Sequence, residues 1–190
     1  MRRGEYRINK LLAIVFIVAL SPFTGGSSVT YADSESYEES QVKAAFLYNF
    51  AKFVIWPQET FPDSISPMTV CILGKDPFGS ALEALKEKKV QERHLSIRRV
   101  AKIEEIERCN VLFVSESEKD NLAAIFVAAR KRHVLTVGDM QGFAQAGGII
   151  NLFTRESRIR FEINTDAAER SSLKISSKLL RLGEIVREKN

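Results

Sequence analysis

The stretch Met68–Lys88, MTVCILGKDPFGSALEALKEK, decides the class of fold that this chain adopts. Its first residues, Met68–Leu73, form an apolar run of strand length in which only Thr69 is polar. The turn-forming sequence Gly74–Gly79 follows, and Ser80–Lys88 then has the apolar spacing of a helix. A strand without polar alternation is buried on both faces, which is typical of a parallel strand covered by helices. The stretch therefore predicts one strand-and-helix unit of a parallel sheet.

The same order of strand and helix continues downstream. Asn110–Ser115 and His133–Val137 are further apolar runs of strand length, and Lys119–Arg130 between them has a helical pattern. His94–Val100 alternates weakly and also suits a strand, while Ile103–Glu107 is at most a short helix. Repeated units of this kind predict an α/β fold, with a mainly parallel or mixed sheet that helices cover on both faces.

The pattern changes in the last third of the chain. Gly148–Phe153 and Arg158–Ile163 read as two strands joined by a short turn, which predicts a β-hairpin. Thr165–Lys189 then predicts a long C-terminal helix with a narrow core-facing seam, and with a break near Ser171 and Ser172.

The N-terminus has the layout of a secretory signal peptide. A basic segment precedes the ten apolar residues Leu11–Leu20, and small residues at Thr30 and Ala32 mark a cleavage site after Ala32. The apolar run spans only about 15 Å as a helix, half the core of a bilayer, which disfavours the alternative of a permanent anchor. We therefore expect residues 1–32 to be a signal peptide and residues 33–190 to be a single exported domain.

The signal segment also carries most of the net charge. The chain has 28 Lys and Arg against 24 Asp and Glu, a formal charge of +4. Residues 1–32 hold four basic residues and one acidic residue, so a charge of about +1 is left for residues 33–190. This balance gives no reason to expect binding to nucleic acid.

An aromatic helix is predicted near the start of the mature chain. Gln41–Trp56 has an amphipathic apolar stripe that ends at Pro57, after a loose polar leader at Asp33–Ser40. The stripe suits a helix docked on the core. Aromatic side chains are also enriched at protein interfaces, so Phe50 and Trp56 are candidates for a partner surface.

The sequence offers little for catalysis. His94 and His133 are the only histidines, and neither has a second ligand at the spacing of a zinc site. Ser115 and Ser117 follow a predicted strand without the glycine pattern of a nucleophile elbow, and no phosphate-binding glycine motif is present. We therefore expect neither an enzyme nor a bound metal or other cofactor.

The loops after three predicted strands are candidate ligand sites, because ligands of parallel sheets bind outside the carboxyl ends of the strands. These loops are Gly74–Asp76, Ser115–Ser117 and Gly138–Asp139. Lys75 and Asp76 are the candidate contacts in the first loop. Ordinary strand-to-helix turn chemistry is the alternative explanation of the same residues.

Three charged residues of the predicted hairpin share one face of a strand. Arg158, Arg160 and Glu162 alternate with apolar residues, and alternate side chains of a strand point to the same face. If this face is exposed, it is a solvated surface. If it is buried, the two arginines need carboxylate or ligand partners, which bidentate bonds would provide.

Cys71 and Cys109 are the only cysteines of the chain. Export to an oxidising compartment predicts that they form one disulfide. Cys71 lies inside one predicted buried strand and Cys109 directly before another, so neighbouring strands would bring the two within disulfide distance.

A series of segments, in order along nearly the whole of residues 33–190, resembles the YfiR-like family of periplasmic regulators from Gram-negative bacteria. The matching segments are VKAAFLYNFAKFVIWP (Val42–Pro57), VCILGKDPFG (Val70–Gly79), CNVLFVS (Cys109–Ser115), VLTVGD (Val134–Asp139), GFAQAGGIINLF (Gly142–Phe153), RIRFEIN (Arg158–Asn164) and LKISSKLLRL (Leu173–Leu182).

The resemblance implies a repressor that binds the periplasmic sensor region of an inner-membrane diguanylate cyclase and holds it inactive, which limits cyclic di-GMP and biofilm formation. It also implies an α/β fold, a homodimer and sensitivity to reduction, since Cys71 and Cys109 match the cysteine pair common in the family. Some relatives have a second pair nearer the C-terminus that this chain lacks, so a switch in that pair does not apply here. The alternative function is a small-molecule-binding module that serves a sensor kinase or another transmembrane receptor.

Overall fold

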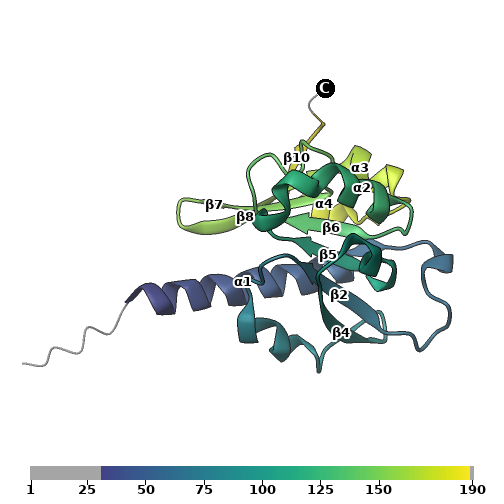
Figure 1. The fold of residues 1–190 in the computed structure, drawn as a ribbon, viewed down its shortest axis with the longest axis horizontal. Helices are drawn as coiled ribbons and strands as arrows, with labels where there is room; N and C mark the ends of the chain where they lie inside the picture. The colour runs from purple at the N-terminus through teal and green to yellow at the C-terminus, as the bar shows by residue number, and fades with distance from the viewer. Residues whose placement is uncertain (1–30, 189–190) are drawn as a thin grey trace, which may run out of the picture. The chain divides into compact units, whose positions relative to one another are not determined.

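The computed structural model describes residues 31–188, and the predicted signal peptide lies outside this part of the chain except for its last two residues. An eight-stranded sheet forms the centre of the described chain, with strand order β10-β8-β7-β6-β5-β2-β4-β3 (Figure 1). Its strands are β2 Met68–Leu73, β3 Lys89–Val90, β4 Arg93–Val100, β5 Val111–Val114, β6 Leu135–Gly138, β7 Ile150–Arg155, β8 Arg158–Asn164 and β10 Glu184–Val186. A separate two-stranded sheet pairs β1 Val54–Ile55 with β9 Lys174–Ile175.

Parallel pairing dominates the middle of the large sheet. β4, β2, β5, β6 and β7 run parallel to one another. Antiparallel pairs occur nearer the edges, between β3 and β4 and between β7 and β8, and β10 then lies parallel to β8. Because each parallel neighbour needs a crossover connection, the faces of the sheet are where the helices pack.

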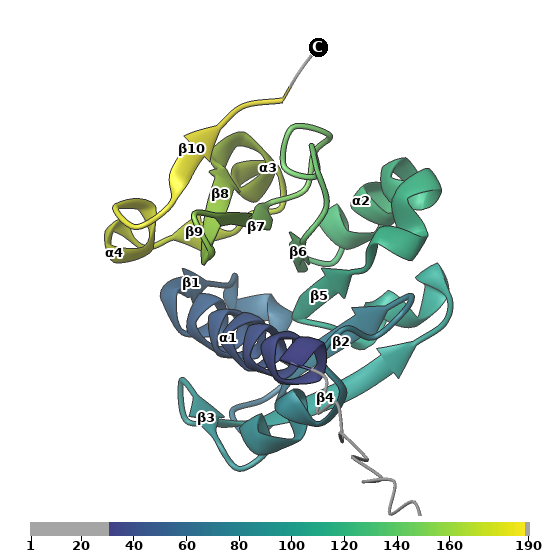
Figure 2. The same cartoon turned by 90° about the vertical axis from the view of Figure 1, so that its left-hand side faces the viewer.

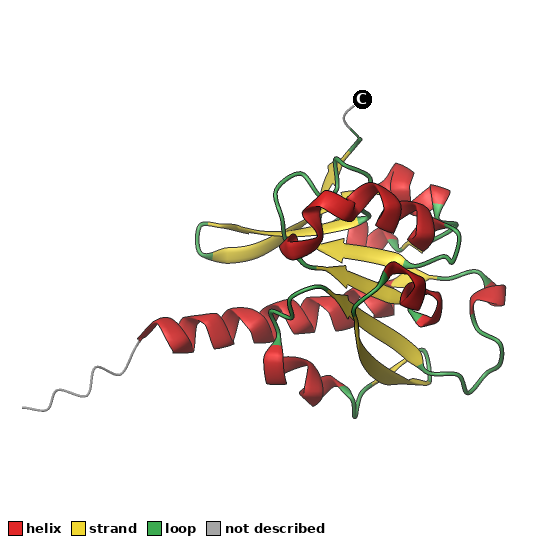
Figure 3. Cartoon of the chain, viewed as in Figure 1, coloured by secondary structure: helices red, strands yellow, loops and turns green. Residues whose placement is uncertain are grey.

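Helices lie on both faces of the sheet (Figures 2 and 3). The α-helices are α1 Tyr31–Phe53, α2 Leu122–Arg130, α3 Thr165–Arg170 and α4 Ser177–Leu180, and the 3-10 helices are η1 Gln58–Thr60, η2 Gly79–Leu85, η3 Ile103–Arg108 and η4 Glu116–Asn121. Residues of α1 and η2 belong to one buried core, and residues of α2 and η3 belong to the other. The predicted fold class, a mixed sheet with helices on both faces, is confirmed.

Strand β2 shows why Met68–Leu73 is apolar apart from Thr69, which is itself buried. Met68, Val70 and Ile72 enter the core on the α1 side of the sheet, whereas Cys71 and Leu73 enter the core on the α2 side. All are buried. A strand whose alternate side chains fill two separate cores has no position left for a polar residue that faces water.

The N-terminal helix is longer at its start and shorter at its end than predicted. Residues 33–40, expected to be a loose leader, are helical and belong to α1. Glu39 pairs with Lys43 one turn later, and such pairs stabilise a helix surface. The helix ends at Phe53 rather than at Trp56, because residues 54–55 leave it to form strand β1 against β9.

The predicted hairpin is confirmed, with a tighter turn than expected. In β7 and β8, Arg155 is paired directly with Arg158, so only Glu156 and Ser157 form the turn. Both have a left-handed backbone, with φ values of 52° and 56°. Such a turn matches the twist of the two strands. Glycine or asparagine usually signals this turn, and neither is present here.

The long C-terminal helix predicted for residues 165–189 is wrong. The segment instead forms α3, β9, α4 and β10 in turn. Ser172 adopts φ 57° and ends α3, while the hydroxyl of Ser176 accepts a bond from the Leu179 N–H and begins α4. Gly183 then lets the chain approach Phe161, because a Cβ at this position would lie 2.6 Å from that ring. The predicted break near Ser171 and Ser172 is where the helix stops.

Candidate ligand cleft and partner groove

A cleft of about 530 Å³ opens at the carboxyl ends of β2, β5 and β6. We call it the strand-end cleft. Its lining comes from the loops after these three strands and from η4, and consists of Lys75, Asp76, Pro77, Ser115, Glu116, Ser117, Lys119 and Asp139. Each of the three loops considered as a candidate ligand site contributes to this one cleft.

Strand register brings the three loops together. Leu73 of β2 lies beside Val114 of β5, and Val114 lies beside Gly138 of β6. The residues that follow these strand ends are therefore neighbours as well. The Ser115 N–H donates to the Leu73 carbonyl at 3.0 Å, which extends the pairing of β2 and β5 to the edge of the cleft.

Gly74 closes the first loop against the second. Its φ is 86°, a left-handed conformation that glycine adopts without strain. A Cβ at this position would lie 2.3 Å from the Ser117 hydroxyl oxygen. That oxygen accepts a hydrogen bond from the Lys75 N–H at 3.0 Å. The absence of a side chain at Gly74 thus permits the bond that joins the two loops.

Both carboxylate oxygens of Asp76 accept hydrogen bonds from other residues of the protein. One of its carboxylate oxygens accepts from the Phe78 N–H at 2.7 Å, and the other accepts from the Arg99 guanidinium at 2.7 Å. The bond to Asp76 is the main reason that the pKa of Arg99 is raised. Asp76 therefore shapes its loop, while Lys75 is left to present its ammonium to the cleft.

An ion-pair cluster ties helix α1 to the cleft. The Lys43 ammonium donates to Asp139 at 2.8 Å and lies 2.8 Å from a Glu39 carboxylate oxygen. The side chains of Lys43 and Asp139 are only 15% and 16% exposed. Burial lowers the pKa of Lys43, but the bonds to Asp139 and Glu39 outweigh burial, so the pKa stands above its usual value. Lys43 is therefore held as a charged ammonium between a helix and a strand end.

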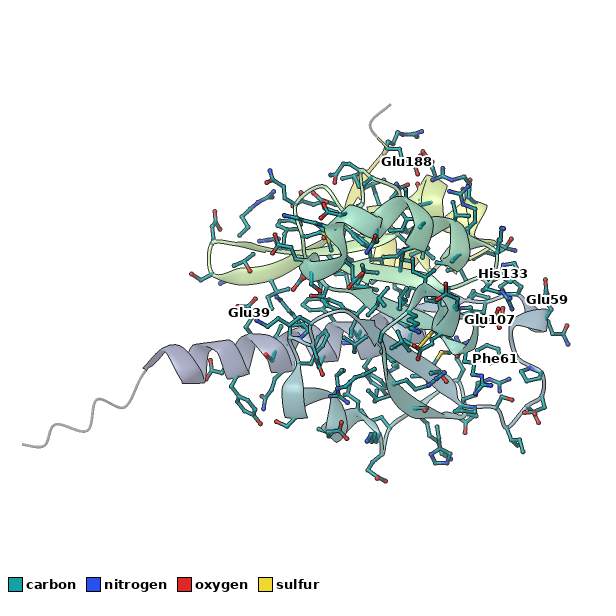
Figure 4. The ribbon with its side chains drawn as sticks, in the orientation of Figure 1. Glu39, Glu59, Phe61, Glu107, His133 and Glu188 are labelled. Atoms are coloured by element: carbon teal, nitrogen blue, oxygen red, sulfur yellow. A yellow bond between two sulfur atoms is a disulfide. The ribbon has the colours of Figure 1, made fainter. Side chains whose placement is uncertain are left out.

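A second concave surface lies between α1 and the β7–β8 hairpin. This α1–hairpin groove has a volume of about 590 Å³ and is lined by Glu38, Glu39, Val42, Phe46, Thr154, Ser157, Arg158 and Ile159. Its floor is apolar, and Val42 is 44% exposed there. Figure 4 shows Glu39 on the side of α1 that faces the hairpin. The helix wall is acidic and the hairpin wall carries Arg158.

The ion-pair cluster connects the two concave surfaces. Asp139 lines the strand-end cleft, Glu39 lines the α1–hairpin groove, and Lys43 bonds to both. A group that competes for Asp139 in the cleft would therefore change the partner of Lys43, and with it the charge balance beside the groove.

The two aromatic candidates for a partner surface lie in the core. Phe50 is fully buried, and its ring centre is 5.1 Å from that of Phe161. Trp56 is 7% exposed and stacks edge-on against Phe61 at 6.4 Å. These positions explain the aromatic stripe as packing between α1, the hairpin and the loop after η1. Neither residue presents a surface to a partner.

The three charged residues of strand β8 differ in their surroundings: two are exposed, and one is hydrogen-bonded within the protein. Arg158 lines the α1–hairpin groove, and Arg160 is exposed. Within residues 31–188 neither arginine forms an ion pair. Both arginines therefore belong to an exposed, solvated face of the strand. Glu162 is half-buried and accepts from the side-chain amides of Gln145 at 3.2 Å and Asn151 at 3.5 Å. The structure thus separates these residues from Lys75 and Asp76.

The ion-pair cluster of Lys43, Glu39 and Asp139 was not predicted from the sequence. The Glu39–Lys43 pair has the spacing of neighbours on a helix face and was detectable as such. The bond between Lys43 and Asp139 joins residues far apart in the chain, and no local pattern signals it.

Cys71 and Cys109 are joined by a disulfide, as expected. Their Cα atoms are 5.7 Å apart, and both residues are buried in the core on the α2 side. The bond links β2 to the segment between η3 and β5. Figure 4 shows Glu107 of η3 close to this part of the chain. Within residues 31–188, no cluster of three or more His, Cys, Asp or Glu could hold a metal ion.

Several solved structures share this fold, among them the following three. The first is the ABC domain in complex with L-Trp from Streptococcus pneumonia, with 10% identity and a TM-score of 0.50 over 77% of this chain and 60% of that chain. The second is a conserved domain protein from Vibrio cholerae O1 biovar eltor, with 11% identity and a TM-score of 0.51 over 75% of this chain and 59% of that chain. The third is a ligand-free, open substrate-binding protein with adhesive properties from Clostridium difficile, with 10% identity and a TM-score of 0.51 over 76% of this chain and 58% of that chain. The chain thus covers less than two thirds of each of them. At such identities the likeness concerns the fold alone.

The fold is that of an α/β domain with a cleft at the carboxyl ends of its parallel strands. The chain belongs to the YfiR/HmsC-like family, which matches residues 40–184. This membership points to a periplasmic regulator. No curated protein matches the sequence. In the described part of the chain, no helix has both the length and the apolar character needed to cross a membrane.

Proposed function

We propose that this protein is a periplasmic repressor that binds the sensor region of an inner-membrane diguanylate cyclase through the α1–hairpin groove. Family membership supports a regulator that works by contact with a membrane-bound signalling protein. The observation that carries the binding surface is the groove itself, in which an apolar floor lies between walls of opposite charge.

The chemistry of the groove suits a protein partner. Val42, Phe46 and Ile159 offer an apolar floor for one or two large side chains, whose burial contributes about 1.5–3 kcal/mol each. The carboxylates of Glu38 and Glu39 and the guanidinium of Arg158 lie at the rim, where charges set orientation and association rate more than affinity. Repression then follows from holding the sensor region in one arrangement, and no catalytic step is required of this chain.

The test replaces Val42 with aspartate. A charge on the floor of the groove must lose its hydration when the partner binds, so the affinity should fall about tenfold or more. Val42→Asp and wild-type protein would be used to capture detergent-solubilised inner-membrane proteins. Cyclic di-GMP would be measured in a deletion strain that carries each form.

Ile65→Asp is the matched control, because Ile65 is 87% exposed and does not line the groove. We expect wild type and Ile65→Asp to capture a diguanylate cyclase and to keep cyclic di-GMP low, and Val42→Asp to fail in both assays. Equal behaviour of the two aspartate variants would exclude the groove as the binding surface. Failure of the wild type to capture a cyclase would exclude the proposed partner.

A second function is favoured by the strand-end cleft. Three loops converge there at the carboxyl ends of parallel strands, and the related fold of the substrate-binding protein supports a small-molecule-binding module that serves a sensor kinase or another receptor. Thermal-shift screening with amino acids, nucleotides and vitamins tests this function. A ligand of the cleft should lose its stabilising effect in Lys75→Ala, and a shift that survives this substitution would place the ligand elsewhere.

A further inference from the structure

A polar pocket lies at the end of the sheet opposite to the strand-end cleft. It has a volume of about 280 Å³ and borders the start of β2, the segment directly before β5 and the loop after η1. We call it the amino-end pocket, and its lining includes Thr60, Thr69, Glu107, Arg108, Asn110 and Arg132. Figure 4 shows Glu107 on the same side of the molecule as Phe61, which also lines the pocket. The pocket shares no lining residue with the strand-end cleft or the α1–hairpin groove.

Asn110 presents an amide nitrogen to this pocket. The residue is 8% exposed, and its side-chain oxygen accepts from the Thr69 N–H at 2.8 Å, which fixes the orientation of the amide. Its backbone N–H donates to the Thr69 carbonyl at 2.9 Å, and its carbonyl accepts from the Leu135 N–H at 2.8 Å. Within residues 31–188, Nδ2 is therefore the one polar atom of Asn110 without a partner. It is not enclosed by protein atoms either, so it faces the pocket.

Two hydroxyl groups of the lining also have no partner among the described residues. Thr69 is 7% exposed, and its hydroxyl forms no hydrogen bond there. The hydroxyl oxygen of Thr60 is enclosed by protein atoms and has no partner. Buried polar groups normally form hydrogen bonds, because leaving them unpaired is costly. Three unpaired groups around one pocket therefore indicate a binding site.

Two arginines give the pocket a positive charge. Arg108 is exposed and, in the described part of the chain, forms neither an ion pair nor a hydrogen bond. Arg132 pairs with Glu107, which is the one acidic residue of the lining. The lining thus carries a net charge of +1, and its single carboxylate is already neutralised.

The unpaired groups define the chemistry of a ligand. An asparagine amide nitrogen and a guanidinium group only donate hydrogen bonds, and a hydroxyl can donate as well. A ligand must therefore supply acceptors, and the positive lining favours a negative charge. The oxygens of a carboxylate or a phosphate group meet both requirements. The volume is slightly below the range of clefts for drug-sized ligands, so the ligand is compact.

We propose that the amino-end pocket binds a small organic anion through a carboxylate or phosphate group. Asn110 and Thr69 donate to its oxygens from the buried end of the pocket, and Arg108 balances its charge from the exposed end. This site is independent of the proposed repression and of the strand-end cleft, because it shares residues with neither surface.

The test follows the side-chain amide of Asn110 by NMR. The full-length chain would be expressed with nitrogen-15, purified from the periplasm and titrated with inorganic phosphate or with succinate, against sodium chloride of equal ionic strength. The Asn110 signals are identified by their loss in Asn110→Asp. We expect at least one of the two anions to move these signals to saturation. Tighter binding of phosphate would assign a phosphorylated ligand, and tighter binding of succinate a carboxylate.

Two variants and a matched control test the donors. Arg108→Gln removes a charge that has no partner in the protein, so it should keep the melting temperature and raise the dissociation constant about tenfold. Asn110→Asp keeps the acceptor for the Thr69 N–H but replaces the donor with a negative charge, and should abolish binding. Arg160→Gln is the control, because Arg160 is also exposed and unpaired but does not line the pocket.

Three results would overturn the proposal. The first is that neither anion moves the Asn110 signals. The second is that sodium chloride moves them equally, which would indicate screening of charge rather than binding. The third is that Arg108→Gln and Arg160→Gln bind the anion with the same affinity. Because Arg108→Gln leaves the fold intact, the last result decides the question even if Asn110→Asp does not fold.

Discussion

Gly74 and Lys43 show how single residues build the strand-end cleft. Gly74 does so by having no side chain, since the Ser117 hydroxyl occupies the space that a Cβ would need. Lys43 does so by its charge, which two carboxylates hold in place at 2.8 Å. Neither role is visible from the residue and its sequence neighbours, because each depends on a loop or strand end brought in from far along the chain.

Gly74→Ala should destabilise the protein more than Gly142→Ala. Both glycines have a left-handed backbone, with φ values of 86° and 78°, which costs an alanine about 1–2 kcal/mol. Only at Gly74 would the new methyl group also displace the Ser117 hydroxyl and break its bond from the Lys75 N–H. Nothing lies within 4 Å of a Cβ at Gly142, so it is the matched control. Urea unfolding of both variants measures the difference, and equal losses would contradict the role given to Gly74.

Lys43 should stabilise the fold until strongly alkaline pH. Its pKa is raised in the folded protein, so its contribution is complete below the ordinary lysine value of 10.5 and is lost as pH rises through the raised value. The difference in free energy of unfolding between wild type and Lys43→Met should be constant between about pH 7 and 9 and should shrink above about pH 10.5. Denaturant unfolding across this range provides the measurement. A difference that grows with pH would mean that the ion-pair cluster does not form.

At the scale of elements, the sequence predicted what local patterns determine. The buried strands were predictable because a run such as Met68–Leu73 fills a core on each face of the sheet, and the hairpin was predictable from alternation in Arg158–Ile163. The C-terminal segment was not predictable, because its apolar spacing suits one long helix as well as several short elements. Ile175 shows the reason: it pairs with Val54 of β1, a partner from the other end of the domain.

The disulfide joins two elements, and its removal should weaken their association. Cys71 and Cys109 are separated by 38 residues, and closing a loop of this length in the unfolded chain contributes about 4 kcal/mol. Cys71→Ser combined with Cys109→Ser, or a reductant, should therefore lower the melting temperature by about 10 °C and relieve repression. Scanning calorimetry with and without dithiothreitol tests this prediction. The double variant is the control, because reductant should not change its melting further, and a wild type indifferent to reductant would contradict the prediction.

Over the whole molecule, the ion-pair cluster offers a route by which the cleft can influence the groove. The strand-end loops were predictable as one candidate site, because parallel strands end at the same edge of a sheet. The groove was not predictable, since it depends on α1 extending alongside a hairpin that comes more than a hundred residues later (Figure 1). For the same reason Phe50 and Trp56, chosen for their aromatic character, proved to be core residues.

Asp139→Asn should weaken partner capture although Asp139 does not line the groove. The neutral amide no longer shares the charge of the Lys43 ammonium, so the ammonium should pair with Glu39 alone and neutralise more of the acidic wall. The capture assay described for Val42→Asp measures the effect, and we expect a several-fold loss. Lys75→Ala is the matched control, because Lys75 lines the cleft without contact to Lys43. Equal capture by Asp139→Asn and wild type would separate the two surfaces.

The pairing of β1 with β9 joins residues from opposite ends of the described chain. The core on the α2 side, with its disulfide, draws its buried residues from Cys71 to Phe143. The core on the α1 side extends from Ala44 to Leu179, so it cannot close until nearly the whole chain has emerged. Both cysteines therefore precede in the chain the last residues that the α1-side core needs, although strand β2 contributes to both cores. Long-range pairing of this kind slows folding, so we expect the closure of the α1-side core to be a late step.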